Sequence, residues 1–268
     1  MDLTLSIDDF TKFAGRHAGE TCFVMGNGPS LNQMDLNLLD GQTVLGSNAA
    51  YMLYDQVQWR HRYYFSCDSL VLPDHSPEIV AMHEANPEME LFFPVVLHHW
   101  DGTNRVEPTE DHIPRARNRY FFRPIPLATH HLPFSAVSAD MNQGLIMPFT
   151  VTINMIEAAA YMGFANIVLI GCDTSYVVPD DVIAEGPEVN GEKSLLTSRS
   201  DDPNHFHPDY FGKGRKWHQP HPDRMIQHYA WAKEAFRYRG VNIINATVGG
   251  RLEVFPRVDY AGLFAAAS

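Results

Sequence analysis

Short apolar runs rich in β-branched and aromatic residues alternate along the chain with segments of helical periodicity. Six such runs are predicted to be strands, at residues 22–25, 43–47, 63–67, 90–94, 167–171 and 241–245. Regular alternation of short strands and helices is typical of an open α/β sheet. The pattern therefore predicts an α/β fold.

Two helices stand out from the same pattern. Residues 152–162 repeat apolar side chains on one face and end before Gly163, which suits a helix C-terminus. Residues 222–239 begin with Pro222 at the first helical position and end before Gly240. A short apolar strand follows each helix, and such helix–glycine–strand units build a mostly parallel sheet.

The chain of 268 residues has the length of one domain, and two segments interrupt its pattern. Residues 97–133 are rich in His, Pro and Arg and are interpreted as a long insertion. Residues 179–221 hold Asp, Gly, Pro and Asn together with four histidines, and are interpreted as a lid. A loop of that length inside a compact domain is usually functional or mobile.

The charge and composition of the chain indicate which kinds of binding partner are compatible with the sequence. The chain carries 20 basic and 32 acidic side chains, a net charge of −12, which argues against nucleic acid as the partner. The excess acid lies mainly in residues 74–90 and 180–202, so a local phosphate site is still compatible with the sequence. The apolar fraction of 45% excludes a disordered chain.

The sequence favours a cytoplasmic protein. It contains no apolar run long enough for a transmembrane helix, and its first residues are acidic rather than basic as in a signal peptide. Three scattered cysteines, Cys22, Cys67 and Cys172, are too few for a disulfide framework.

A glycine-rich turn follows the first predicted strand. Its residues are Gly26, Asn27, Gly28, Pro29 and Ser30, before Leu31. Glycines let a backbone turn sharply close to a ligand, and a following helix N-terminus would present N–H groups to an anion. The turn is neither the dinucleotide fingerprint nor a Walker A loop, because Leu31 replaces the third glycine and no Gly-Lys-Ser/Thr follows. An ordinary strand-to-helix turn is the alternative.

Polar side chains also follow three other predicted strands. They include Asn48, Asp68, Asp173 and Ser175. In open α/β sheets, ligands bind outside the carboxyl ends of the strands. Carboxylates there could hold ribose hydroxyls and amides could read a base edge, so the four strand ends together predict a nucleotide or sugar-nucleotide pocket.

The lid has three interpretations: a metal site, a polar surface loop, or a catalytic lid that clamps phosphate. The close pairs His205/His207 and His218/His221 suggest metal, but the prolines forbid regular helical spacing and no cysteines accompany them, so no metal ligand is predicted. The third interpretation is favoured because basic side chains gather here in an acidic protein: Lys213, Arg215, Lys216 and Arg224.

Two lid histidines are candidates for a general base. His221 immediately precedes Pro222, so the positive end of the predicted helix dipole would keep its ring neutral and able to accept a proton. His218 is the competing candidate, with stacking beside Trp217 as its structural alternative.

With these motifs in order, the chain resembles a group shared by the family 42 sialyltransferases, the DUF115 domain of the flagellin-modifying Maf glycosyltransferases and the MptE-like 6-hydroxymethylpterin diphosphokinases. The resemblance spans roughly residues 21–254, and its most specific parts are the Gly-Asn-Gly-Pro-Ser-Leu turn and residues 150–176. It implies a Rossmann-like fold with helices on both faces of the sheet.

The sialyltransferase resemblance also implies roles for single residues. Asn27 and Asn48 would contact the nucleotide or its phosphate, Thr150 would lie beside the donor, Tyr210 would supply a phosphate-binding hydroxyl, and His221 matches the catalytic base. The basic residue that this family carries just before its small-residue helix start is absent, since Met147-Pro148-Phe149 stands there. The lid also differs in length.

The leading hypothesis is a glycosyltransferase that uses a CMP-activated, sialic-acid-like donor and a glycan or other hydroxyl acceptor, and requires no cofactor. An MptE-like diphosphokinase is the alternative; it would transfer diphosphate from ATP to a pterin alcohol and require Mg²⁺, with Asp68 and Asp173 as ligands. A nucleotide-sugar-binding protein without catalysis is a third possibility. A homo-oligomer is suggested only by analogy with the related sialyltransferases.

Overall fold

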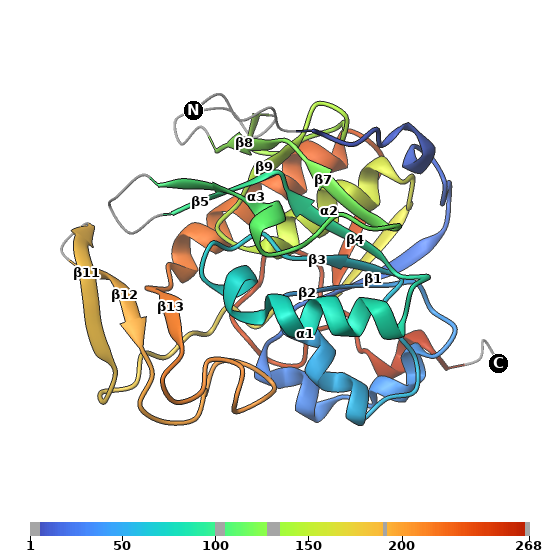
Figure 1. Cartoon of the computed structure of the whole chain (residues 1–268). Helices are drawn as coiled ribbons and strands as arrows, with labels where there is room; N and C mark the ends of the chain where they lie inside the picture. Colours follow the sequence, from blue (N-terminus) through green and yellow to red (C-terminus); the bar gives the residue numbers. More distant parts are fainter. Residues whose placement is uncertain (1–5, 100–104, 128–134, 190–191, 266–268) are drawn as a thin grey trace.

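Parallel strands form the centre of the molecule. The computed structural model describes residues 6–99, 105–127, 135–189 and 192–265, and in these residues seven parallel strands pair in the order β14-β10-β1-β2-β3-β4-β7 (Figure 1). Their bounds are β1 Thr21–Met25, β2 Val44–Ser47, β3 Tyr63–Phe65, β4 Glu90–Pro94, β7 Arg119–Phe122, β10 Asn166–Ile170 and β14 Asn242–Asn245. All six predicted strands are present, and the predicted Rossmann-like α/β fold is confirmed.

The order of the strands places a switch point beside β1. The chain runs from β1 outward through β2, β3, β4 and β7, and then returns to add β10 and β14 on the other side of β1. The loops after the adjacent strands β1 and β10 therefore lead away from each other, towards opposite sides of the sheet. Open α/β sheets bind ligands in the crevice at such a point.

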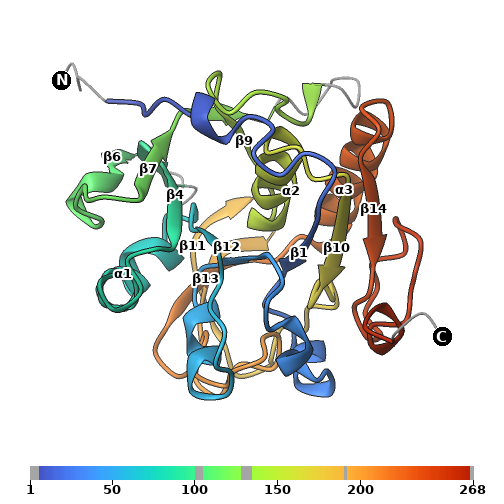
Figure 2. The same cartoon turned by 90° about the vertical axis from the view of Figure 1, so that its right-hand side faces the viewer.

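Helices cover both faces of the sheet, as predicted. The helices α2 Val151–Tyr161 and α3 Pro222–Arg237 pack with Cys22 and Val24 of β1 in one core cluster. The helix α1 Val71–Ala85 packs with Phe23 and Met25 in a second cluster on the other face (Figure 2). Successive residues of a strand point to opposite faces of the sheet. An uninterrupted apolar strand therefore contributes side chains to both core clusters.

The helix α1 is absent from the sequence-based assignment because Pro73 and Pro77 lie in it. Proline is tolerated in the first turn of a helix, but an interior proline removes a hydrogen bond. Short 3₁₀ helices complete the described elements: η1 Thr11–Phe13, η2 Pro29–Gln33, η3 Leu36–Leu39, η4 Ala50–Asp55, η5 Thr109–Asp111 and η7 Ala261–Leu263.

The segment 97–133 is only partly an insertion, which corrects the sequence analysis. Its residues Arg119–Phe122 are β7, the edge strand of the central sheet. The remainder contributes to two small sheets, formed by β5 Val96–His98 with β6 Val106–Pro108 and by β8 Pro124–Pro126 with β9 Leu145–Met147. No α-helix separates β4 from β7 in the described residues, so the usual strand–helix alternation gives no signal for β7. Residues 100–104 and 128–133 of this segment lie outside the described residues.

The lid segment 179–221 contains a small antiparallel sheet beside the central sheet (Figure 1). Its strands are β11 Ile183–Val189, β12 Glu192–Thr197 and β13 Lys216–His218. Leu196 and Trp217 are paired across β12 and β13, and both are buried. In the described part of the chain, no helix is long and apolar enough to cross a membrane.

Candidate functional site

A cavity of about 580 Å³ opens at the carboxyl ends of β1, β2, β3 and β10. This volume is in the range of small-molecule binding pockets. Its walls come from the loops after these four strands, from the first residues of α2 and α3, and from the lid. The four polar strand ends thus meet in one pocket, as predicted from the sequence.

Most of the predicted site residues line this cavity. They are Gly26, Asn27, Gly28, Asn48, Asp68, Thr150, Asp173, Ser175, Tyr210, His218, His221 and Arg224. Four predicted residues are absent from its lining, namely Pro29, Ser30, Lys213 and Arg215.

Three N–H groups of the glycine turn, those of Gly26, Gly28 and Ser30, bond within the protein instead of facing a ligand, contrary to the sequence-based expectation. The N–H groups of Gly26 and Gly28 donate to the carbonyls of Ile170 at 2.8 Å and Gly171 at 2.9 Å. The N–H and hydroxyl of Ser30 both donate to the Asp173 carboxylate, at 3.2 and 2.6 Å. Burial raises the pKa of Asp173, and the bonds from Ser30 oppose this effect. A carboxylate of the protein therefore occupies the place predicted for an external anion.

Close packing explains both glycines of the turn. A Cβ on Gly26 would lie 2.4 Å from the carbonyl oxygen of Gly171. A Cβ on Gly28 would lie 1.9 Å from Oδ2 of Asp173. The loops after β1 and β10 can approach this closely only where side chains are absent.

Asn27 and Tyr210 join the turn to the lid. The Asn27 amide nitrogen donates to the Ser47 carbonyl at 3.1 Å and to the Tyr210 hydroxyl at 3.2 Å. Burial raises the pKa of Tyr210. Oδ1 of Asn27 is buried without a hydrogen-bond partner among the described residues.

Other unpaired polar atoms share this pocket. Nine buried polar side-chain atoms of the described residues have no hydrogen-bond partner, and four of them belong to residues that line it: Asn27, Ser69, Ser194 and His218. Nε2 of His218 is within ion-pair distance of Asp68 but makes no hydrogen bond to it. Buried polar atoms are normally hydrogen-bonded, so this concentration indicates a site for a polar ligand.

Backbone strain is also concentrated here. Asn48 and Thr174 have positive φ angles of 55° and 51°, and both line the pocket. Asparagine tolerates this region, whereas for a β-branched threonine it is a clear outlier. Such strain persists where the surrounding structure imposes it, often at functional sites.

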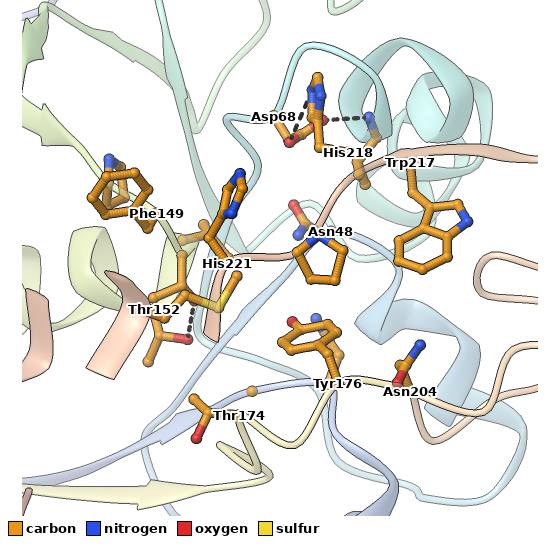
Figure 3. Close-up of a pocket in the computed structure, with 18 of the residues that line it drawn as sticks. Asn48, Asp68, Phe149, Thr152, Thr174, Tyr176, Asn204, Trp217, His218 and His221 are labelled. Carbon is orange, nitrogen blue, oxygen red and sulfur yellow. Dashed lines mark hydrogen bonds and ion pairs between the residues drawn. The ribbon is translucent and has the colours of Figure 1, made fainter. Parts of the chain in front are cut away.

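Both candidate bases reach the pocket. Oδ1 of Asp68 accepts the N–H groups of Leu70 at 2.7 Å and Val71 at 3.0 Å, which fixes its carboxylate at the start of α1. Oδ2 of Asp68 lies 3.7 Å from Nε2 of His218 (Figure 3). His221 lies at the N-cap of α3 and lines the same cavity. His218 therefore has a carboxylate partner that sequence spacing could not reveal.

A third histidine lines the pocket and is missing from the predicted site. Nδ1 of His205 lies 2.7 Å from Oδ2 of the buried Asp202. The His205 ring stacks on Tyr210, with ring centroids 3.8 Å apart. The only sequence signal for this pair is that Asp202 precedes His205 by three residues. Outside a helix, that spacing does not imply a contact.

Three of the four predicted cations are not at the pocket, and their assignment is corrected. Lys213, Arg215 and Lys216 line a separate surface hollow beside Asp74. Arg215 forms an ion pair with Asp74, and Lys216 lies 3.1 Å from Glu185. Acidic side chains on α1 and β11 therefore hold these two cations away from the cavity.

Two other cations do line the cavity. They are the predicted Arg224 and the unpredicted Lys193. The Arg224 guanidinium lies 5.7 Å from the centre of the Phe149 ring. Arg224 therefore brings positive charge to an aromatic wall of the pocket.

The carboxylates of Asp68 and Asp173, the magnesium ligands of the alternative function, are both hydrogen-bonded within the protein. Both oxygens of Asp173 accept from Ser30, and Oδ1 of Asp68 accepts two backbone N–H groups. No group of three or more His, Cys, Asp or Glu residues arranged for a metal ion occurs in the described ranges.

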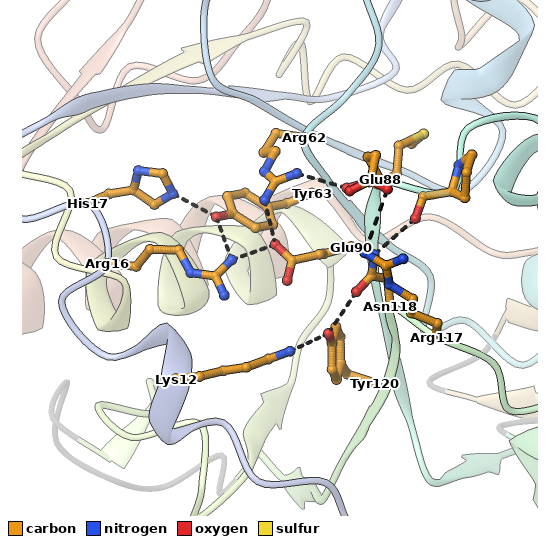
Figure 4. Close-up of polar contacts among 12 residues, drawn as sticks. Lys12, Arg16, His17, Arg62, Tyr63, Glu88, Glu90, Arg117, Asn118 and Tyr120 are labelled. Atoms are coloured by element: carbon orange, nitrogen blue, oxygen red, sulfur yellow. Dashed lines mark hydrogen bonds and ion pairs between the residues drawn. The ribbon is translucent and has the colours of Figure 1, made fainter.

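A second polar cluster lies at the opposite, amino-terminal edge of the sheet (Figure 4). The buried Glu90 accepts from Arg16 at 2.5 Å and from Arg62 at 3.1 Å. His17 contacts the Tyr63 hydroxyl at 2.6 Å. These charges pair with one another and attach the segment before β1 to the sheet. Because the cluster has this structural role, the candidate ligand site is the pocket at the carboxyl edge.

Fold and site together define an open α/β protein with a polar ligand pocket at the switch point of its sheet. No family model matches the chain, and no curated protein matches it. Among solved structures, it is similar to a Maf glycosyltransferase from Magnetospirillum magneticum AMB-1, with a TM-score of 0.48 and 17% identity over 92% of this chain and 35% of that one. This chain thus spans about a third of the Maf protein.

The chain is also similar to the sialyltransferase CstII from Campylobacter jejuni, whose structure is a complex with a substrate analogue, cytidine-5'-monophosphate. The TM-score is 0.44, with 14% identity over 90% of this chain and 85% of that one. At these values neither likeness decides an activity, and the chemistry must be argued from the pocket.

Proposed function

We propose that the chain is a glycosyltransferase that transfers a sialic-acid-like sugar from a CMP-activated donor to a hydroxyl acceptor. One observation carries this proposal: four polar strand ends meet with unpaired buried polar atoms and two candidate bases in a pocket at the switch point. The sequence motifs that resemble the sialyltransferases fall at this same pocket. The likeness to a structure containing cytidine-5'-monophosphate motivates the choice of CMP.

The nucleotide would bind at the ends of β1, β2 and β10. The unpaired Oδ1 of Asn27 would accept an N–H of the base or a ribose hydroxyl, which removes the cost of leaving that oxygen unpaired. Asn48 lies at the next strand end and supplies a second amide.

The transfer step needs a proton acceptor and a stabilised leaving group. A pocket histidine, His221 or His218, takes the proton of the acceptor hydroxyl while the oxygen bonds to the anomeric carbon of the sugar. The bond from that carbon to the phosphate oxygen breaks, and CMP leaves with the electron pair. Arg224 would offset the negative charge of the departing phosphate.

The identity of the nucleotide tests this function. Thermal unfolding is measured with CMP, UDP and ATP–Mg²⁺, since a ligand that binds only the folded state raises the melting temperature. We expect stabilisation by CMP, followed by CMP release when a CMP-sugar and acceptor saccharides are supplied. Stabilisation by ATP–Mg²⁺ alone would support a diphosphokinase, and CMP binding without transfer to any acceptor would support a binding protein.

A further inference from the structure

The pair Asp202–His205 has no role in the proposed reaction, although its two groups lie closer together than Asp68 and the candidate base His218. Its two side chains are only 2% and 8% exposed, and the distance between their atoms is 2.7 Å. The corresponding separation between Asp68 and His218 is 3.7 Å.

The lid fixes the Asp202 carboxylate in place. It accepts the N–H of Asn204 at 2.7 Å and that of Phe211 at 3.0 Å, in addition to Nδ1 of His205. The stack on Tyr210, with the two rings only 3° from parallel, fixes the plane of the imidazole. His205 therefore presents Nε2 in one direction.

This nitrogen belongs to a residue that lines the pocket. Nε2 of His205 has no hydrogen bond to the described residues, yet it is not among the buried unpaired atoms. Since His205 lines the cavity, the accessible part of its ring includes this nitrogen.

The ring lies over the switch point of the sheet. The residue after it, Phe206, donates its N–H to the Asn27 carbonyl at 2.9 Å, and its stacking partner Tyr210 contacts the Asn27 side chain. On the β10 side, the His205 ring lies edge-on to Tyr176 of the loop after β10, with ring centroids 6.1 Å apart. His205 is thus close to the loops after both β1 and β10.

Several of the donors that the sequence suggested for a phosphate are used elsewhere. The N–H groups of Gly26, Gly28 and Ser30 are used within the protein, and the cations of residues 213–216 lie outside the cavity. With Nδ1 directed at the Asp202 carboxylate, Nε2 donates to a phosphate oxygen when the ring carries both protons, and such charge-assisted bonds are about twice as strong as neutral ones.

We propose that His205, held by Asp202, binds the phosphoryl group of the donor nucleotide through Nε2. This inference rests on the proposed function, because it takes the phosphate-bearing ligand from it. His205 then sets the preference for a nucleotide over the corresponding nucleoside.

Two substitutions separate binding from structure. In His205→Asn, the side-chain amide can replace Nδ1 in the bond to Asp202, but nothing replaces Nε2. In His205→Gln, the amide reaches the place of Nε2 as a neutral donor, but the bond to Asp202 is lost. His207→Gln is the matched control, since His207 belongs to the same loop and does not line the cavity.

Calorimetric titration with CMP and with cytidine measures the contact. We expect His205→Asn to weaken CMP binding about tenfold or more and to leave cytidine binding unchanged, whereas His205→Gln weakens CMP binding less. His207→Gln should bind both ligands as the wild type does.

The two proposals fail in different ways. A wild-type preference for CMP over cytidine that persists in His205→Asn would overturn the role of His205 and leave the proposed function standing. Equal weakening of both ligands, most severe in His205→Gln, would show a structural role and also overturn it. Binding of neither ligand to the wild type would overturn the proposed function, and the role of His205 with it.

Discussion

The Asp173 carboxylate accepts both the hydroxyl and the backbone N–H of Ser30, at 2.6 and 3.2 Å. This contact ties the loop after β1 to the loop after β10 at the point where their strands diverge. The positive end of the short helix η2 is thereby used inside the protein. A phosphate in the pocket is therefore not held by η2, and the side chains of Arg224 and His205, which line the pocket, are candidates for this role.

The first prediction concerns the packing of these two loops. Gly28→Ala should destabilise the protein by about 1–3 kcal/mol, because its Cβ would lie 1.9 Å from Oδ2 of Asp173 and 2.8 Å from the Gly171 carbonyl. The φ angle of Gly28 is −69°, so the cost comes from the lack of space and not from backbone strain. Urea unfolding measures the change.

Gly262→Ala is the control for this substitution. The nearest atom to its Cβ is the end of the Asp259 side chain at 3.1 Å, which can move aside. Equal stability of Gly28→Ala and the wild type would contradict the packing explanation. It would also mean that Asp173 can leave Ser30 at little cost.

The sequence predicts the sheet well because its central strands are buried on both faces. Strands such as β10 appear as unbroken apolar runs between clear turn signals. The edge strand β7 is not predicted because it follows a stretch rich in Pro and Arg. In the described residues, no α-helix lies between β4 and β7. The helix α1 is likewise not predicted, because prolines lie in it. The contacts of Asp68 with the first N–H groups of this helix are visible only in three dimensions.

The site is predictable only where it depends on strand ends. A parallel sheet brings the residues after β1, β2, β3 and β10 to one edge, so Asn27, Asn48, Asp68 and Asp173 could be grouped from sequence. The lid obeys no such rule. Two of its cations pair with Asp74 and Glu185, and His205 contacts Asp202. These contacts depend on the path of the loop, which the periodicity of the sequence does not predict.

The second prediction concerns the positive charge in the pocket. Arg224→Ala should weaken nucleotide binding about tenfold or more, since it removes a cation that lines the cavity. Lys213→Ala should leave the affinity unchanged, because Lys213 lines the separate hollow beside Asp74. Titration of both variants with CMP at one fixed salt concentration gives the comparison. A larger loss in Lys213→Ala would restore the lid cations as the phosphate clamp.

The third prediction concerns the general base. His221→Ala should lower turnover by about 10²–10⁴-fold and leave nucleotide affinity nearly intact, because proton transfer contributes on that scale. His218→Ala and Asp68→Asn should then have smaller effects. The readout is kcat together with the dissociation constant for the nucleotide.

A reversed result would assign the base to His218. In that case His218→Ala would abolish turnover, and Asp68→Asn would reduce it, because the carboxylate 3.7 Å from Nε2 would act through the ring. The pH profile of kcat should then shift in Asp68→Asn, which a purely structural role of Asp68 would not produce. Unchanged turnover in all three variants would contradict both assignments.

The last prediction concerns the dependence of stability on pH, and it rests on the buried Glu157 of α2. Its carboxylate accepts the N–H groups of Ser138 at 2.6 Å and Ile146 at 3.2 Å, and so fastens the segment before the pocket wall 147–149. Burial nevertheless raises its pKa from 4.5 to about 8, against these bonds. The folded state therefore holds this proton more tightly than the unfolded state does.

The stabilisation from this proton is fully present below pH 4.5 and is lost as the pH rises towards 8. One proton corresponds to a slope of about 1.4 kcal/mol per pH unit in that window. Glu157→Gln cannot titrate, so the free energy of unfolding of the wild type minus that of the variant should fall as the pH rises from 5 to 8. Urea unfolding of both proteins at several pH values isolates the residue, because the other titrating groups cancel in the difference. A difference independent of pH would mean that the N–H donors of Ser138, Ile146 and the Asn154 side chain outweigh burial and that Glu157 is ionised throughout.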